Sequence, residues 1–132
     1  MNPWRLLPRL VRRQRRGRTV RWIDAETLAD RPSKDSLAII DVRSPEEFTG
    51  PLGHLENAVN IPIGELPGRL TEIKALQGMP VMLVCRTDKR SVTAVALLED
   101  AGFSDLSVLR GGMEQWNRDG RPVGKGGAAT AE

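Results

Sequence analysis

The chemistry that this 132-residue sequence suggests centres on its single cysteine. Cys85 is followed by the run Arg86-Thr87-Asp88-Lys89-Arg90, and a helical segment then begins near Ser91. A strand–loop–helix turn of this length can direct backbone N–H groups and the positive end of a helix at the sulfur. With three cationic side chains added, these features favour the thiolate, which is the nucleophilic form of cysteine. The pattern predicts a Cys85 nucleophile beside an anion-receiving loop; the alternative is a cysteine that only packs in the core.

The composition excludes several other kinds of site. One cysteine and one histidine leave no disulfide framework and no zinc centre built from these residues, so we expect neither a metal nor a cofactor. No apolar run approaches the roughly 18 residues that a membrane-spanning helix needs. A lone cysteine suits a reducing compartment, and we therefore expect a cytoplasmic protein.

The basic character of the chain is concentrated at its start. Eight arginines and no acidic residue lie in residues 1–22, which leaves 12 basic against 17 acidic residues in the remainder, a formal charge of −5. We interpret residues 1–18 as a basic arm. A solvated tail, a contact with an anionic membrane surface or nucleic acid, and an organellar transit peptide are its alternative roles. The folded body itself does not have the charge of a nucleic-acid-binding surface.

Short apolar runs alternate with helical segments between residues 19 and 123. The predicted strands are 19–23, 37–42, 58–61, 81–85 and 106–109. The predicted helices are 25–30 with Asp24 as N-cap, a short one from Ser44, 65–76, 91–101 closed by Gly102, and 113–118. Such alternation predicts a parallel α/β sheet with its site beyond the carboxyl ends of the strands, where Cys85 falls. The Gly/Ala-rich residues 124–132 are predicted to be a flexible tail.

Four stretches, one of them the cysteine loop, occur in order between residues 20 and 122. They are Asp41-Val42-Arg43 with Glu47-Phe48, Gly53-His54 through Ala58-Val59-Asn60-Ile61-Pro62, Cys85 through Ser91, and Gly111-Gly112 through Trp116. In this combination the sequence resembles the rhodanese-like sulfurtransferases. The resemblance implies a five-stranded parallel sheet flanked by helices on both faces, with Cys85 as the nucleophile that forms a persulfide.

The resemblance also implies roles for the residues around the cysteine. The substrate-binding residues would be Arg86, Thr87, Asp88, Lys89, Arg90 and Ser91. Asp41 and Arg43 would be a structural pair that orients the loop after the second strand. The six residues from Cys85 to Arg90 match the loop length of the sulfur-transferring members. Phosphatases of this fold have one residue more, so phosphatase or arsenate reductase activity is disfavoured.

Two positions depart from the pattern that the resemblance implies. Asp88 and Asn57 stand where the family commonly has glycine, and both residue types tolerate a positive φ, so we expect the backbone shape to be kept. The carboxylate of Asp88 would place a negative charge near the anion site and oppose the use of thiosulfate. His54 is interpreted as a structural residue of a turn, and Trp116 as packing for the last helix.

The expected reaction is ping-pong transfer of a sulfane sulfur through a Cys85 persulfide. Thiosulfate or a similar small anion would be the donor, and a thiol, cyanide or a protein would be the acceptor. A non-catalytic persulfide carrier, or a module that docks a partner, needs the same cysteine and loop and is the alternative. We expect a monomer or a weak dimer.

Overall fold

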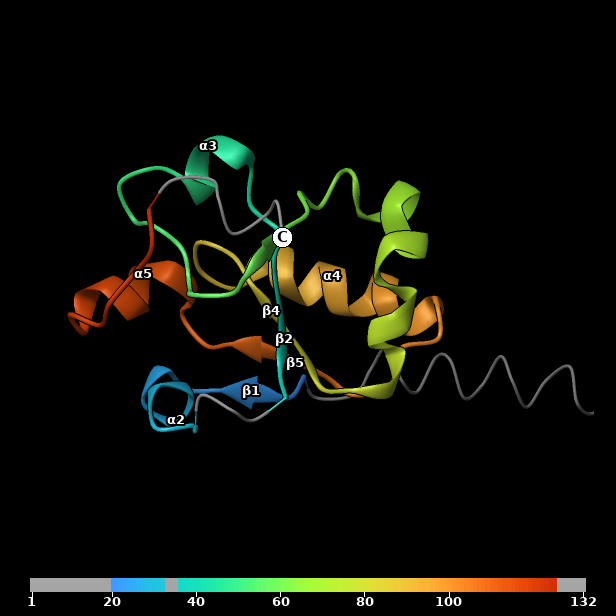
Figure 1. The fold of residues 1–132 in the computed structure, drawn as a ribbon, viewed down its shortest axis with the longest axis horizontal. Coiled ribbons are helices and arrows are strands. Elements are labelled where there is room, and N and C mark those ends of the chain that lie inside the picture. The colour runs from blue at the N-terminus through green and yellow to red at the C-terminus, as the bar shows by residue number, and fades with distance from the viewer. Residues whose placement is uncertain (1–19, 33–35, 126–132) are drawn as a thin grey trace, which may run out of the picture.

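A computed structural model describes residues 20–32 and 36–125 (Figure 1). The arm predicted for residues 1–18 lies outside the described residues, as do residues 126–132 of the predicted tail. No helix in the described ranges is long and apolar enough to cross a membrane.

The centre of the fold is a parallel sheet of five strands. These are β1 (Trp22–Ile23), β2 (Ala38–Asp41), β3 (Val59–Asn60), β4 (Val81–Val84) and β5 (Leu106–Leu109). Their order across the sheet is β1-β5-β4-β2-β3, and every pairing is parallel. The middle strand β4 is buried along its whole length, as expected for a parallel strand covered on both faces. The predicted five-stranded parallel sheet is confirmed.

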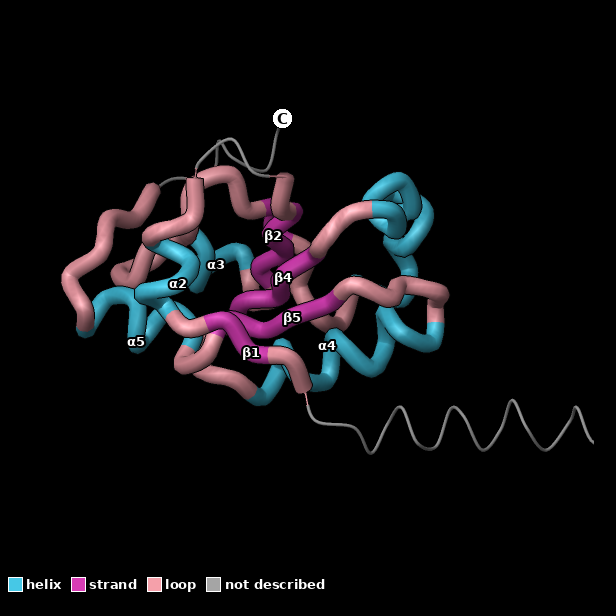
Figure 2. Tube along the Cα trace, turned by 90° about the horizontal axis from the view of Figure 1, so that it is seen from below, coloured by secondary structure: helices cyan, strands magenta, loops and turns pink. Residues whose placement is uncertain are grey.

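Helices cover both faces of this sheet (Figure 2). On one side lie α2 (Ala25–Ala29), α3 (Pro45–Phe48) and α5 (Gly112–Arg118), and on the other lie α4 (Lys89–Asp100) and η1 (Leu66–Gly78). Alternate residues of β4 divide between the two layers: Met82 and Val84 pack with α5, while Val81 and Leu83 pack with α4. Cys85 continues the second set, so its side chain belongs to the α4 side of the sheet.

Two of the predicted helices differ in the structure. The α-helix predicted for residues 65–76 is the 3-10 helix η1, which is kinked at Arg69 (φ −121°, ψ 17°). Pro67 and Gly68 in its first turn explain this, because proline removes a backbone donor and glycine disfavours the regular helix. The helix predicted from Ser91 begins two residues earlier, at Lys89, so Lys89 and Arg90 belong to the first turn of α4.

The helix ends follow the sequence more closely. The hydroxyl of Ser44 accepts from the N–H of Glu47, whose carboxylate accepts from the N–H of Ser44, so the predicted start of α3 is confirmed as a capping box. Gly102, at φ 104°, follows the end of α4 as predicted. Asp24 occupies the N-cap position of α2, but its carboxylate accepts from Arg110 instead of capping the helix.

The chain beyond α5 returns to the body of the domain. Gly124 pairs with His54 in both directions, at N···O distances of 2.8 and 2.9 Å. Residues 124 and 125 of the predicted tail are therefore part of the described structure, and Gly124 is held by this pairing. His54 stacks on Phe48 with 3.8 Å between ring centroids, and its Nδ1 lies 2.8 Å from the Phe48 carbonyl oxygen. These contacts confirm the structural interpretation of His54.

Candidate active site

Cys85 lies at the carboxyl end of the central strand, directly after β4 and four residues before α4 begins. The residue is 1% exposed and its thiol is free. The chain must turn sharply here to connect β4 with α4 on the neighbouring layer. Residues 86–88 form this turn, and the remaining predicted substrate-binding residues, Lys89, Arg90 and Ser91, lie in the first turn of the helix.

The start of α5 holds one side of this loop. The N–H of Met113 donates to the Cys85 carbonyl at 2.9 Å, and the N–H of Glu114 donates to the Arg86 carbonyl at 3.0 Å. A Cβ atom at Gly112 (φ 57°) would lie within 2.6 Å of the carbonyl oxygens of Cys85, Arg86 and Thr87. Only glycine allows this close approach. Three successive loop carbonyls therefore face the start of α5.

The opposite side of the loop carries its amide groups. A trans peptide points its C=O and the following N–H in opposite directions, so the N–H groups of residues 86–88 face away from α5. Within the described part of the chain, the backbone N–H groups of residues 86–91 form no hydrogen bond. The last three belong to the first turn of α4, where an α-helix has no internal partner for them. Together they form a cradle of donors next to Cys85, suited to an anion or a thiolate.

The cationic side chains of the loop are less available than the sequence indicates. Nε of Arg86 is paired with Glu114 at 2.6 Å. Arg90 forms two hydrogen bonds to Glu47, at 2.7 and 3.0 Å. Lys89 is exposed and has no ion pair among the described residues. Carboxylates from α3 and α5 thus counter two of the three cations, and the main positive feature left near Cys85 is the amide cradle.

The pairing of Glu47 with Arg90 shifts the titration of both groups. The Arg90 guanidinium lowers the pKa of Glu47 from 4.5 to about 2. The Glu47 carboxylate in turn raises the pKa of Arg90, with smaller contributions from the charges of Cys85 and Asp41.

Asp88 differs from the expectation based on its glycine-like position. Its φ is −132°, so the predicted left-handed backbone is wrong here, whereas Asn57 does have a positive φ of 69°. The Asp88 carboxylate does not cap α4 but accepts from the N–H of Gly111 at 2.9 Å. This bond adds to the two backbone bonds and the Arg86–Glu114 ion pair that connect the loop to the start of α5. It explains how a carboxylate is accommodated in a loop whose N–H groups are unbonded within the described residues.

Asp41 and Arg43 form the buried network that the resemblance implies. Nη2 of Arg43 lies 2.8 Å from Asp41 and 2.7 Å from the Gly53 carbonyl oxygen, and Nε also donates to Asp41. The side-chain amide of Asn60 donates to the carbonyls of both Asp41 and Arg43 at 2.9 Å. The network joins the end of β2 to β3 and to the loop that leads to His54.

Ser91 is the last of the predicted substrate-binding residues and, unlike Thr87 and Lys89, it is buried. Its side chain is fully buried in the first turn of α4, and the hydroxyl has no hydrogen-bond partner among the described residues. Thr87 is exposed at the tip of the loop. A buried hydroxyl without a partner costs free energy, so the unmet hydrogen bond of Ser91 is an unfavourable feature of the fold within the described residues.

Sequence reasoning missed the partners that come from distant elements. Glu114 is 28 residues from Arg86, and Gly111 is 23 residues from Asp88. No local spacing connects such pairs. The motif Gly111-Gly112 was the one available signal, because adjacent glycines at a helix start suggest a close backbone approach. Trp116, by contrast, packs in the core and donates to the Pro122 carbonyl as its predicted packing role requires.

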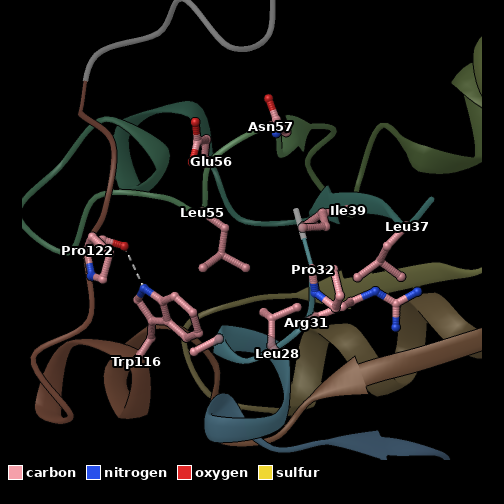
Figure 3. Close-up of a pocket in the computed structure, with 11 residues that line it drawn as sticks. Leu28, Arg31, Pro32, Leu37, Ile39, Leu55, Glu56, Asn57, Trp116 and Pro122 are labelled. Atoms are coloured by element: carbon pink, nitrogen blue, oxygen red, sulfur yellow. Dashed lines mark hydrogen bonds between the residues drawn. The ribbon is translucent and has the colours of Figure 1, made fainter. Parts of the chain in front are cut away.

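The structure has a groove beside the loop and a separate apolar hollow away from it. A groove of about 320 Å³ borders the loop and contains Arg43, Glu47 and Arg86 in its lining. An apolar hollow of about 290 Å³ lies on the α2 and α5 side, between Leu28, Leu55 and Trp116 (Figure 3), and no residue of 85–91 lines it. No group of three or more histidine, cysteine or acidic residues in the described ranges could hold a metal ion.

Comparison with known proteins agrees with this geometry. Residues 24–119 match the rhodanese-like domain. A sulfurtransferase from Allochromatium vinosum is 32% identical over 102 residues, which cover 76% of this chain and 92% of that protein. The putative sulfur carrier protein YrkF from Bacillus subtilis is 31% identical, covering 64% of this chain and 43% of that protein.

Solved structures show the same fold. A rhodanese-related protein from Thermoplasma volcanium superimposes with a TM-score of 0.67 at 28% identity, covering 77% of this chain and 95% of that one. The family match spans most of the domain and includes Cys85 with the whole loop that follows it. The chain therefore belongs to the rhodanese-like sulfurtransferase family.

Proposed function

We propose that this protein transfers sulfane sulfur through a persulfide on Cys85. The thiolate attacks the outer sulfur of thiosulfate or a similar small anionic donor. The sulfur–sulfur bond of the donor breaks, sulfite leaves, and the transferred sulfur remains bound to Cys85. A thiol, cyanide or a protein thiolate then attacks this outer sulfur and regenerates the Cys85 thiolate.

The observation that carries the proposal is the set of unbonded N–H groups of residues 86–91 beside Cys85. Unbonded amide donors beside a sulfur stabilise negative charge on an attacking thiolate and on the terminal sulfur of a persulfide. Because α5 fixes the loop carbonyls on the other side, the donors keep their orientation without help from a substrate. The hydroxyl of Ser91 supplies one more donor in the same turn.

The charge arrangement bears on the choice of donor. Arg86 and Arg90 each have a carboxylate partner, so the loop offers less net positive charge to a dianion than its sequence suggests. Thiosulfate would be held mainly by backbone amides. A second candidate role is that of a persulfide carrier with little turnover, which is supported by the similarity to the putative sulfur carrier protein YrkF.

Intact-mass analysis tests the proposal directly. Incubation with thiosulfate should add one sulfur, about 32 Da, and cyanide or a reductant should remove it. Cys85→Ser should show no added mass and no thiosulfate:cyanide turnover, with an unchanged melting temperature, because a serine hydroxyl is nearly isosteric but forms no persulfide. Turnover retained by Cys85→Ser would exclude this mechanism. Stable loading with negligible turnover would favour the carrier role.

A further inference from the structure

The groove beside the loop has the size of a small-molecule subsite. Its volume of about 320 Å³ lies at the lower end of the range for such sites. It borders the loop that follows Cys85, because its lining includes Arg86 and also Glu47, the partner of Arg90. Its lining consists of Arg43, Glu47, Pro51, Leu52, Arg86 and Glu114.

The groove carries two carboxylates that can accept further hydrogen bonds. The side chains of Glu47 and Glu114 are 33% and 31% exposed. Oε2 of Glu114 accepts from Arg86, while Oε1 has no partner within the described chain. An ionised carboxylate has about four acceptor positions, so the pair with Arg86 does not saturate it. The remaining acceptor positions of Glu47 and Glu114 can bind a positively charged ligand group.

The groove also has an unused hydrogen-bond donor, on the buried side chain of Arg43. Arg43 is 1% exposed, and its Nε and Nη2 atoms are used by Asp41 and Gly53. Nη1 forms no hydrogen bond within the described residues, although Arg43 lines the groove. A buried guanidinium with an unused donor favours a carboxylate or another hydrogen-bond acceptor. The lining therefore matches a ligand that carries both charges.

We propose that this groove is the acceptor subsite and that the acceptor is a small thiol of the cysteine type. Its ammonium group would bind at Glu114 Oε1, its carboxylate at Arg43 Nη1, and its methylene group against Pro51 and Leu52. This proposal rests on the proposed persulfide chemistry of Cys85.

The transfer step requires no additional reactant. The acceptor thiolate attacks the outer sulfur of the Cys85 persulfide, and a new sulfur–sulfur bond forms to the acceptor. The bond between the two sulfurs at Cys85 breaks, and its electron pair remains on the Cys85 thiolate. The acceptor leaves as a persulfide, so no net oxidation or reduction occurs.

A panel of four thiols tests the two charges separately. The protein is first loaded with thiosulfate, freed of excess donor, and mixed with cysteine, cysteine methyl ester, N-acetylcysteine or N-acetylcysteine methyl ester. Loss of the added sulfur is followed by intact mass as a function of thiol concentration. Each thiol is compared between the wild-type protein and Glu114→Gln, because this ratio cancels the intrinsic reactivity of the thiol.

We expect Glu114→Gln to raise the half-saturating concentration about three- to tenfold for cysteine and its methyl ester, which carry the ammonium group. The two N-acetyl derivatives should change by less than about twofold or improve, since Arg86 is released to bind anions. Glu46→Gln is the matched control: it makes the same charge change on α3 at a residue that does not line the groove.

Equal effects of Glu114→Gln on all four thiols, or no effect on any, would overturn this assignment while leaving the Cys85 persulfide intact. Failure to load sulfur on Cys85 would instead remove the proposed function itself. The wild-type protein adds a second criterion: cysteine should saturate unloading at a lower concentration than either singly blocked derivative. Saturation at the same concentration by all of the thiols would also contradict an amino-acid subsite.

Discussion

Two parts of the site differ in how many of their polar groups are hydrogen-bonded. The network of Asp41, Arg43 and Asn60 is buried, and each of its three side chains is hydrogen-bonded to another or to the backbone, with Arg43 Nη1 left to the groove. In the segment 86–91 the side chains of Arg86, Asp88 and Arg90 have partners, but the backbone N–H groups and the hydroxyl of Ser91 have none within the described chain. The buried network therefore stabilises the fold, whereas the segment 86–91 keeps several unused hydrogen-bond donors.

This difference indicates how stability and activity are divided. Breaking a satisfied buried network leaves an unpaired group in the interior and costs folding free energy. Removing an unsatisfied donor costs little folding free energy but withdraws a group that a ligand can use. Substitutions in the two parts should therefore produce opposite patterns of stability and sulfur transfer.

The largest effect should come from Arg43→Met. The substitution leaves the Asp41 carboxylate buried without its partner, which should lower the free energy of unfolding by about 3–5 kcal/mol. Urea denaturation measures this loss. The double variant Asp41→Asn with Arg43→Met should recover part of it, because the buried charge is removed.

Arg69→Met is the matched control for this prediction. Arg69 pairs with Glu65 and Glu72 on the surface, with its side chain 32% exposed. The same chemical change there should cost less than about 1 kcal/mol, since exposed pairs contribute little. Equal losses at the two positions would mean that the buried network has no special role.

Ser91→Ala should show the opposite pattern. The hydroxyl has no hydrogen bond to lose, so the melting temperature should be unchanged or slightly higher. If the hydroxyl binds the sulfur, kcat/KM should fall roughly tenfold, the equivalent of one hydrogen bond to a charged group. Ser44→Ala provides the contrast, because that hydroxyl caps α3 and its removal should cost about 1 kcal/mol of stability. Unchanged sulfur transfer in Ser91→Ala would exclude this role.

The sequence predicted features that depend on local pattern. The parallel sheet, the capping box at Ser44 and the position of Cys85 after the central strand all follow from short stretches of residues. It did not predict the partners of Arg86 and Asp88, because these come from α5, more than 20 residues away. It also predicted the start of α4 two residues too late, because the charged residues Lys89 and Arg90 have no apolar pattern that identifies them as helical.

Asp88 tests whether the loop is organised or merely charged. Asp88→Asn keeps an acceptor for the N–H of Gly111 and should alter the rate of persulfide formation by less than about twofold. Asp88→Gly removes that acceptor, and we expect about threefold slower loading from thiosulfate, together with a loss of about 1 kcal/mol in stability. Faster loading by both variants would show instead that the carboxylate repels the donor, as the sequence alone suggested.

The smallest effect concerns acid stability through Glu47. Its pKa is about 2 in the folded protein against 4.5 for an unpaired glutamate, so its ionised form stabilises the fold at every pH above 4.5. As the pH falls below 4.5 the unfolded chain takes up a proton first, and the contribution is lost by about pH 2. Because the pair with Arg90 is one-third exposed, solvent screening limits the effect to about 1 kcal/mol.

Glu47→Gln keeps an acceptor for the Ser44 N–H but should flatten this part of the stability profile, measured by urea denaturation between pH 2 and 6. Glu46→Gln, on the same helix and without an ion pair among the described residues, should leave the slope unchanged. The same slope in all three proteins would mean that the Glu47–Arg90 pair does not stabilise the folded state.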